Sequence, residues 1–193
     1  MTRSVVQLGG QALKLDADGD TTIQVSSDDV LIVDTAGNEA LKIDASGHVT
    51  KPLQPAFMAT LSANVSNIAV SSSYSLVCNT EIFDNNGDYD TSNGTFTAPV
   101  TGRYALYFNT RTESIPTDGS WWQWTIDASN RDVNILTSVA QFDQTTDYYG
   151  QNIAMIMDMD ASDTAKMSLY INGGTQQVDI NANATFFGGH LIG

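Results

Sequence analysis

The sequence predicts an all-β protein, and three observations support this fold class. Short runs of alternating apolar and polar residues recur along the chain, as they do in half-buried strands. Gly, Asn, Asp, Ser and Thr are plentiful between these runs, which is typical of turn-rich β proteins. No run is long and periodic enough to indicate an amphipathic helix. Hydrophobic residues make up 41% of the chain and charged residues 16%, which is the composition of a folded protein.

Composition divides the chain into three parts. Residues 1–50 contain no Phe, Tyr, Trp, Pro or Cys, and we interpret them as an N-terminal β-repeat stem. Residues 51–55 include Pro52 and Pro55, which favour an extended linker because proline cannot donate to a strand ladder. Residues 56–193 carry the aromatic residues and are predicted to form a C-terminal β-sandwich or jelly-roll head.

The stem contains a short repeat at residues 13–19, 31–37 and 41–47. Each copy is an apolar alternation followed by an Asp-x-x-Gly turn, in which Asp caps its own backbone and Gly accepts a positive φ. Because fifty residues without aromatics bury little apolar surface alone, we expect an intertwined stem in which three chains share one core. The residues expected in that core are Leu13, Leu15, Leu31, Val33, Leu41 and Ile43.

The head is predicted to consist of short antiparallel strands. They are expected near residues 57–61, 75–79, 95–97, 102–110, 121–126, 133–139, 147–157, 165–171, 178–180 and 184–191. The central strand, 102–110, places Tyr104 and Phe108 on one face and Tyr107 on the other. Large residues on both sides predict that this strand is buried on both faces.

This part of the chain resembles the C1q-like domain, the globular head of complement C1q and a jelly roll related to the tumour-necrosis-factor fold. The resemblance extends over residues 56–192. The matching segments are Phe83-Asp84-Asn85, Tyr89-Asp90 and residues 94–104 followed by Phe108, with 56–59 similar to the opening strand and 185–192 to the closing one.

The resemblance implies a jelly-roll fold and a homotrimer. It implies little about a ligand, because one fold hosts many functions. In C1q-like and related trimers the contact between subunits is apolar and aromatic. The residues that this implies near the threefold axis are Tyr104, Phe108, Phe186 and Phe187.

A second resemblance concerns the junction between stem and head. The repeats followed by residues 47–57 look like the stem-to-head junctions of trimeric bacteriophage fibre and virion surface proteins. This resemblance implies a non-enzymatic structural protein on the surface of a phage particle. It would be a capsid decoration (cement) protein or a short fibre, with capsid or tail proteins as partners of the stem and the head exposed.

Charge and hydropathy argue against two classes of partner. Eight Lys and Arg stand against 22 Asp and Glu, so the formal net charge is -14. This charge repels phosphates, and the basic residues do not cluster, which excludes nucleic-acid binding. No apolar stretch approaches the ~18 residues of a membrane span. The N-terminus lacks the apolar run of a secretory signal, so we expect neither a membrane partner nor ordinary secretion.

The sequence offers no catalytic set. The histidines are His48 in a stem repeat and His190 in the closing strand, and Cys78 lies in a short strand-like run. These positions assemble neither a Ser-His-Asp nor a Cys-His arrangement. The acid pair Asp158 and Asp160 lies in a turn-like segment. We therefore expect a protein that is not an enzyme.

Two acidic segments raise the question of calcium. In residues 16–27 the glycine stands fourth and a serine twelfth, whereas an EF-hand loop needs glycine sixth and glutamate twelfth. We interpret this segment as a turn. Asp84, Asp88 and Asp90 form a better oxygen cluster, and some C1q-like heads hold calcium. Otherwise we expect no metal or cofactor.

An aromatic run supplies the alternative functions. In the strand 121–126, Trp122 and Trp124 should face the core and Trp121 the opposite side. Exposed aromatic rings provide rigid contact area for a sugar or a receptor. The surface-binding candidates are Trp121, Tyr148 and Tyr149. The chain could thus be the receptor-binding head of a tail fibre or spike that recognises host-surface glycan, or a bacterial C1q-like adhesin.

Overall fold

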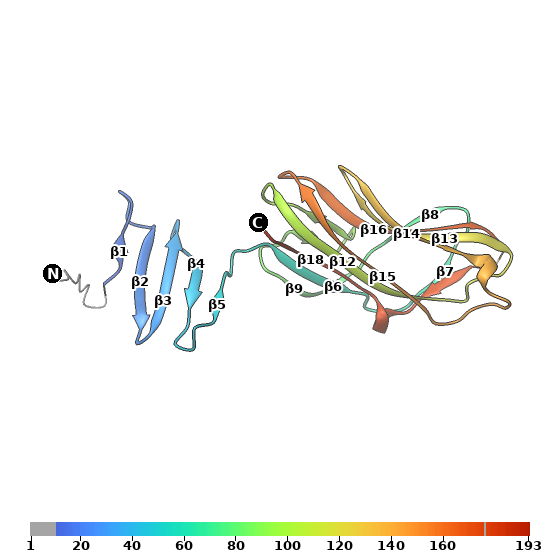
Figure 1. Ribbon diagram of the computed structural model, residues 1–193, viewed down its shortest axis with the longest axis horizontal. Coiled ribbons are helices and arrows are strands. Elements are labelled where there is room, and N and C mark those ends of the chain that lie inside the picture. Colours follow the sequence, from blue (N-terminus) through green and yellow to red (C-terminus); the bar gives the residue numbers. More distant parts are fainter. Residues whose placement is uncertain (1–10, 176) are drawn as a thin grey trace. The chain divides into compact units, whose positions relative to one another are not determined.

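The structure, a computed structural model, describes residues 11–175 and 177–193 and divides the chain into two compact units between Gln54 and Pro55 (Figure 1). This boundary lies inside the predicted linker. Within the described ranges the regular structure is strand apart from two 3-10 turns, Val139–Gln141 and Ala182–Ala184, which confirms the all-β prediction. None of the described residues forms a helix that is long and apolar enough to cross a membrane.

The N-terminal unit is one antiparallel sheet whose strands follow one another in chain order. Its strands are β1 (Leu13–Lys14), β2 (Thr22–Ser27), β3 (Val30–Thr35), β4 (Asn38–Ile43) and β5 (Val49–Thr50). Register brings the apolar residues of neighbouring strands opposite one another, as in the rows Leu13, Ile23, Val33, Leu41 and Leu31, Ile43, Val49. The sheet therefore has one apolar face.

The three predicted Asp-x-x-Gly turns behave differently. Asp16 accepts hydrogen bonds from the Gly19 and Thr21 nitrogens at 2.9 and 3.0 Å. Asp44 likewise accepts from the backbone nitrogens of its own turn. Asp34 differs from the prediction, because its carboxylate accepts from the side chains of Thr22 and Gln24 on the neighbouring strand β2. Two of the three aspartates therefore cap their own turns, and the third ties two strands together.

The head is a sandwich of two sheets (Figure 1). The six-stranded sheet contains β10 (Tyr89–Asp90), β11 (Thr95–Thr97), β16 (Thr164–Gly173), β13 (Gly119–Ala128) and β14 (Asp132–Ser138), with β8 (Ser73–Leu76) on β16. The seven-stranded sheet contains β7 (Val65–Ile68), β17 (Val178–Ile180), β12 (Gly102–Glu113), β18 (Phe186–Leu191), β6 (Ala56–Thr60) and β9 (Thr80–Asp84), with β15 (Tyr149–Met159) on β12.

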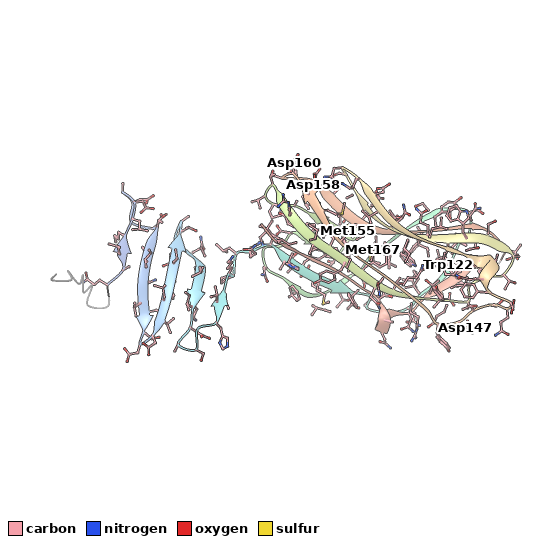
Figure 2. All side chains as sticks on the ribbon, viewed as in Figure 1. Trp122, Asp147, Met155, Asp158, Asp160 and Met167 are labelled. Carbon is pink, nitrogen blue, oxygen red and sulfur yellow. The ribbon has the colours of Figure 1, made fainter. Side chains whose placement is uncertain are left out.

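The core of the head lies between these two sheets. Its largest buried side chains include Trp122, Trp124, Tyr104, Phe57, Phe96, Phe108 and Phe187. Phe57 stacks on Tyr89 and Phe96 with ring centroids 4.9 and 4.7 Å apart. In Figure 2, Trp122 and Met167 lie between the layers, and both are fully buried.

The central strand β12 is fully buried on one face only. Tyr104, Leu106 and Phe108 point into the core and are at most 1% exposed. Ala105 and Tyr107, which alternate with them, are half-buried in a single chain. The sequence predicted that this strand is buried on both faces. This is confirmed for one face, whereas the other face is only partly covered.

This arrangement corrects part of the predicted contact between subunits. The side chains of Tyr104, Phe108 and Phe187 are buried inside one head, so another subunit cannot contact them. Phe186, the fourth candidate, is half-buried and points to the outer side of the seven-stranded sheet. Period-two alternation sends neighbouring residues of one strand to opposite faces, so Phe186 and Phe187 lie in different environments. A contact of Phe186 with another subunit stays a prediction.

Candidate functional site

The outer face of the seven-stranded sheet carries a group of apolar residues, bordered on the same face by polar ones such as Arg103, Asn109 and His190. Register places Ala105 opposite Ile156, and Tyr107 opposite both Ala154 and Gly188. Met58 of β6 lies opposite Gly188 on one neighbouring strand and opposite Phe83 on the other. We call this surface the apolar face; its members are Met58, Phe83, Ala105, Tyr107, Ala154, Ile156 and Phe186.

Large side chains of the apolar face are open to solvent in a single chain. Ile156 is 60% exposed and Phe83 42%. The rings of Tyr107 and Phe186 meet edge to face at 6.5 Å. An outward apolar surface of this kind on a protein with a net charge of -14 is characteristic of a protein contact.

The sheet of the N-terminal unit also has an apolar face. Val25 and Val49 are 56% and 55% exposed, and Leu13 and Leu15 43% and 53%. Leu31, Val33, Leu41 and Ile43, the other predicted core residues, are half-buried. The unit is a single layer of strands, so none of its own described strands forms a second layer over this face.

The outer face of the six-stranded sheet is different, because it is polar and carries two aromatic rings. Trp121 of β13 and Tyr170 of β16 have ring centroids 5.5 Å apart with planes tilted by 32°. They line a groove of about 410 Å³, which we call the Trp121 groove. Its other lining residues include Gln123, Asp127, Ser168 and Asn172.

The tryptophans of β13 alternate as predicted. Trp122 and Trp124 are fully buried, and each indole nitrogen donates a hydrogen bond inside the head, to Gln151 Oε1 and Thr112 Oγ1 respectively. Trp121 is half-buried on the opposite side. Its role in surface binding stays a prediction.

The two tyrosine candidates lie in different environments. Tyr149 is half-buried, with its ring centroid 5.2 Å from that of Trp122 and 5.4 Å from that of Phe142, so it belongs to the edge of the core. Tyr148 is 69% exposed. The Arg111 guanidinium lies 5.1 Å from the centre of its ring. Only Tyr148 of this pair is available to a partner.

The acidic candidates use their carboxylates locally. Asp84 accepts hydrogen bonds from the Gly87 and Tyr89 nitrogens at 3.1 and 2.8 Å. Hydrogen bonds from Ser92 and Asn93 lower the pKa of Asp90, whereas burial raises the pKa of Asp88. Among the described residues, the acidic group whose oxygens all lie within 4.8 Å of one another is instead Asp16, Asp18 and Asp20, on an exposed turn of the N-terminal unit.

In Asp16 the carboxylate is part of a turn. Hydrogen bonds from Thr21 and Gly19 lower the pKa of Asp16 to about 2. Burial of the neighbouring carboxyl and repulsion by Asp16 raise the pKa of Asp20. Asp16 has a lowered pKa because hydrogen bonds of its own turn stabilise its ionised form, and its negative charge in turn raises the pKa of Asp20 beside it.

The histidines and the cysteine do not build a catalytic centre. His48 Nδ1 lies 2.9 Å from Asp44 Oδ2 on an exposed turn of the N-terminal unit. His190 is exposed on the seven-stranded sheet, with its ring 6.5 Å from Tyr107. Cys78 is fully buried, and burial raises the pKa of its thiol to about 12, so the thiol stays protonated.

Comparisons with known proteins agree with this geometry. The family profile of the C1q domain matches residues 56–192. The globular domain of zebrafish complement 1qA protein is a structural neighbour, with 17% identity, a TM-score of 0.54 and coverage of 72% of this chain and 98% of that one. Murine APRIL at pH 5.0 is another, with 10% identity, a TM-score of 0.51 and coverage of 72% and 99%. No curated protein sequence matches the chain significantly.

Proposed function

Because the chain belongs to the C1q domain family, we propose that it is a homotrimeric, non-enzymatic structural protein of a phage particle, attached through its N-terminal stem. Domains of the C1q and tumour-necrosis-factor type typically form trimers and generally act as binding or structural modules. The apolar face is the observation that carries the proposal for this chain.

The apolar face suits two further copies of the same chain. Two small residues, Ala105 and Ala154, lie beside the large Tyr107 and Ile156, so an opposing surface can approach closely and pack against the larger side chains. Aromatic and Met side chains are enriched in protein interfaces, and charged side chains are depleted at their centres. A threefold arrangement buries the face of each subunit against its neighbours with no open end.

Assembly into a trimer would also bury the apolar face of the stem. Its single sheet exposes Leu13, Val25 and Val49, and three such sheets around one axis supply the layer that each lacks. The row of Ile23, Val33 and Leu41 would then line the shared core. Burying apolar area contributes roughly 25 cal/mol per Å², so three stems stabilise one another where one alone exposes its core.

The resemblance of the stem-to-head junction to phage proteins supports a place on the virion surface. The protein would be a decoration protein or a short fibre, with its stem on capsid or tail proteins and its head exposed. Three identical stems engaged together would prolong attachment through avidity. The Trp121 groove favours a second candidate, a receptor-binding head. A bacterial C1q-like adhesin would use the same surfaces on a cell.

The mass of the full-length protein in solution tests the assembly. Light scattering should give three times the chain mass of 20.7 kDa. Ile156→Asp, which places a charge on the apolar face, should make the trimer dissociate at a higher protein concentration than the wild type does, while the protein still unfolds cooperatively. The control is Leu136→Asp, because Leu136 is 52% exposed but lies on the other sheet, and it should remain trimeric.

Two results would contradict the proposed assembly. One is a monomeric wild-type protein. The other is an Ile156→Asp variant whose trimer is as stable to dilution as that of the wild type, which would place the contact between the heads on another surface.

Location is tested separately from assembly. Peptides of the chain should be found by mass spectrometry in density-purified phage particles, and antibodies against the head should label the intact particles. Labelling of a bacterial surface in the absence of phage would favour the adhesin instead.

A further inference from the structure

We propose that the Trp121 groove binds a neutral saccharide, with a sugar ring stacked on Trp121 and its hydroxyl groups bound by the polar residues beside it. This inference deepens the second candidate function, the receptor-binding head, and rests on it for its biological meaning. It uses the other sheet of the head, so its geometry is independent of the trimer contact.

The three tryptophans of the head differ in the bonding of their indole nitrogens. The indole nitrogens of Trp122 and Trp124 are bonded inside the core. The Trp121 indole nitrogen makes no hydrogen bond to any described residue, and its side chain is only partly buried, beside Tyr170. A large ring with a free donor at the surface suits a ligand with an apolar side and a polar side.

Polar side chains lie around the rings of Trp121 and Tyr170. Trp121 is paired with Asn172, and Gln123 with Tyr170, across β13 and β16. Neither the Asn172 amide nor the Tyr170 hydroxyl bonds a described residue, while the Gln123 amide nitrogen donates to Thr125 Oγ1 at 3.1 Å. An amide presents a donor and an acceptor side by side, which matches neighbouring hydroxyl groups of a sugar.

The far end of the groove carries negatively charged side chains. Asp127 and Asp132 face each other in the strand register. The Lys166 Nζ atom lies 3.7 Å from Asp127 Oδ2 and compensates the charge of Asp127. The whole chain carries a net charge of -14. Carboxylates accept hydrogen bonds from sugar hydroxyls, but they repel a ligand that bears phosphate, sulfate or carboxylate. The groove therefore favours a neutral saccharide.

Other occupants fit the groove less well. β13 is hydrogen-bonded to β14 on one side and to β16 on the other, so a peptide cannot add as a further strand here. A lipid chain needs a mostly apolar pocket, whereas this lining is mainly amide, hydroxyl and carboxylate. Nucleic acid is excluded by the same negative charge. The volume of about 410 Å³ lies in the range of small-ligand sites, roughly 300–1,000 Å³.

The test follows the indole N–H signals of the full-length protein by two-dimensional NMR. The probes are neutral oligosaccharides of glucose, mannose, galactose and N-acetylglucosamine, each titrated alone. At least one should shift the Trp121 signal and leave those of Trp122 and Trp124 in place. Trp121→Phe identifies the signal by its loss.

Variants then measure the contribution of each group. Trp121→Ala should weaken binding by at least about tenfold, the equivalent of 1.4 kcal/mol. Asn172→Ala keeps the aromatic pair and should also weaken binding, which guards against misfolding of the tryptophan variant. The matched control is Tyr148→Ala, an exposed aromatic outside the groove, and its affinity should not change.

Three outcomes would overturn the inference. The first is that no neutral probe shifts the Trp121 signal. The second is binding that survives Trp121→Ala and Asn172→Ala, and the third is a sialylated probe that binds as tightly as its neutral counterpart. Light scattering on the same samples reports the assembly state. A monomer that binds sugar contradicts the trimer alone, and a trimer without binding contradicts the groove alone.

Discussion

Gly188 of β18 lies against the ring of Tyr107 on β12, the residue directly opposite it in the strand register. A Cβ atom added at position 188 would come within 2.8 Å of Tyr107 Cε2 and 3.0 Å of the Phe57 carbonyl oxygen. The absence of a side chain at Gly188 therefore lets the Tyr107 ring lie across the apolar face. This close approach links the packing of one head to the surface that we propose for assembly.

Gly188→Ala is expected to destabilise the head by about 1–3 kcal/mol, because the methyl group must displace the ring or the β6 backbone. It should also weaken the trimer. Urea unfolding at a fixed protein concentration measures the first effect, and light scattering on dilution measures the second. The control is Gly150→Ala, whose Cβ would meet its nearest neighbour at 3.9 Å. Equal stabilities of the two variants would contradict this prediction.

Gln151→Ala should also be destabilising. The Gln151 side chain connects the two sheets, because its oxygen accepts from the Trp122 indole and its nitrogen donates to Thr137 Oγ1 at 2.7 Å. Removing it leaves the N–H of a fully buried Trp122 without a partner, at a cost of about 1–3 kcal/mol.

Thermal and chemical unfolding measure this loss. Gln144→Ala, at an exposed position outside the strands, should change the free energy of unfolding by less than about 0.5 kcal/mol. A Gln151→Ala protein as stable as this control would show that the indole hydrogen bond adds nothing.

The head should lose stability in acid partly through Asp163. A hydrogen bond from Ser129 and one from the Asp160 nitrogen lower the pKa of this carboxyl below 3.8. An acid whose folded pKa is lowered stabilises the fold fully above its unfolded pKa, and this stabilisation disappears as pH falls through the folded pKa. The contribution of Asp163 is therefore complete at neutral pH and fades below 3.8.

Melting temperatures between pH 2 and pH 7 check this sign. Asp163→Asn should melt below the wild type at neutral pH, and the two curves should converge below 3.8. Curves that converge at neutral pH and separate in acid would contradict the assignment.

Cys78 should resist thiol reagents in the native protein. Its side chain is fully buried, and burial raises the pKa of the thiol to about 12. Since the thiolate is the reactive form, labelling by a maleimide or a disulfide reagent should be slow at mildly alkaline pH and become rapid in denaturant. Rapid labelling without denaturant would show that this part of the core opens easily.

Several features of the head were predictable because they depend on local chemistry. The motif of residues 94–104 and the alternation of β12 and β13 gave the family resemblance and most of the long strands. Strands β7, β9 and β10 were not predicted. Thr80–Asp84 and Val65–Ile68 are short and carry many exposed polar residues, so their strand conformation depends on the neighbours β6 and β17 with which they pair.

By itself, the sequence determined the all-β class, the division near residues 51–55 and the alternation of side chains, since turn residues and period-two patterns act over a few residues. For β13 the sequence also predicted the side that faces the core, but for β12 and β18 only the tertiary structure set it. It turned Tyr104 and Phe108 inward and left Tyr107, Phe186 and Ile156 outside. It also brought Trp121 and Tyr170 together from strands almost fifty residues apart. Alternation defines two faces, and where both carry aromatic residues, as in β12 and β18, only the packing of one sheet on another tells them apart.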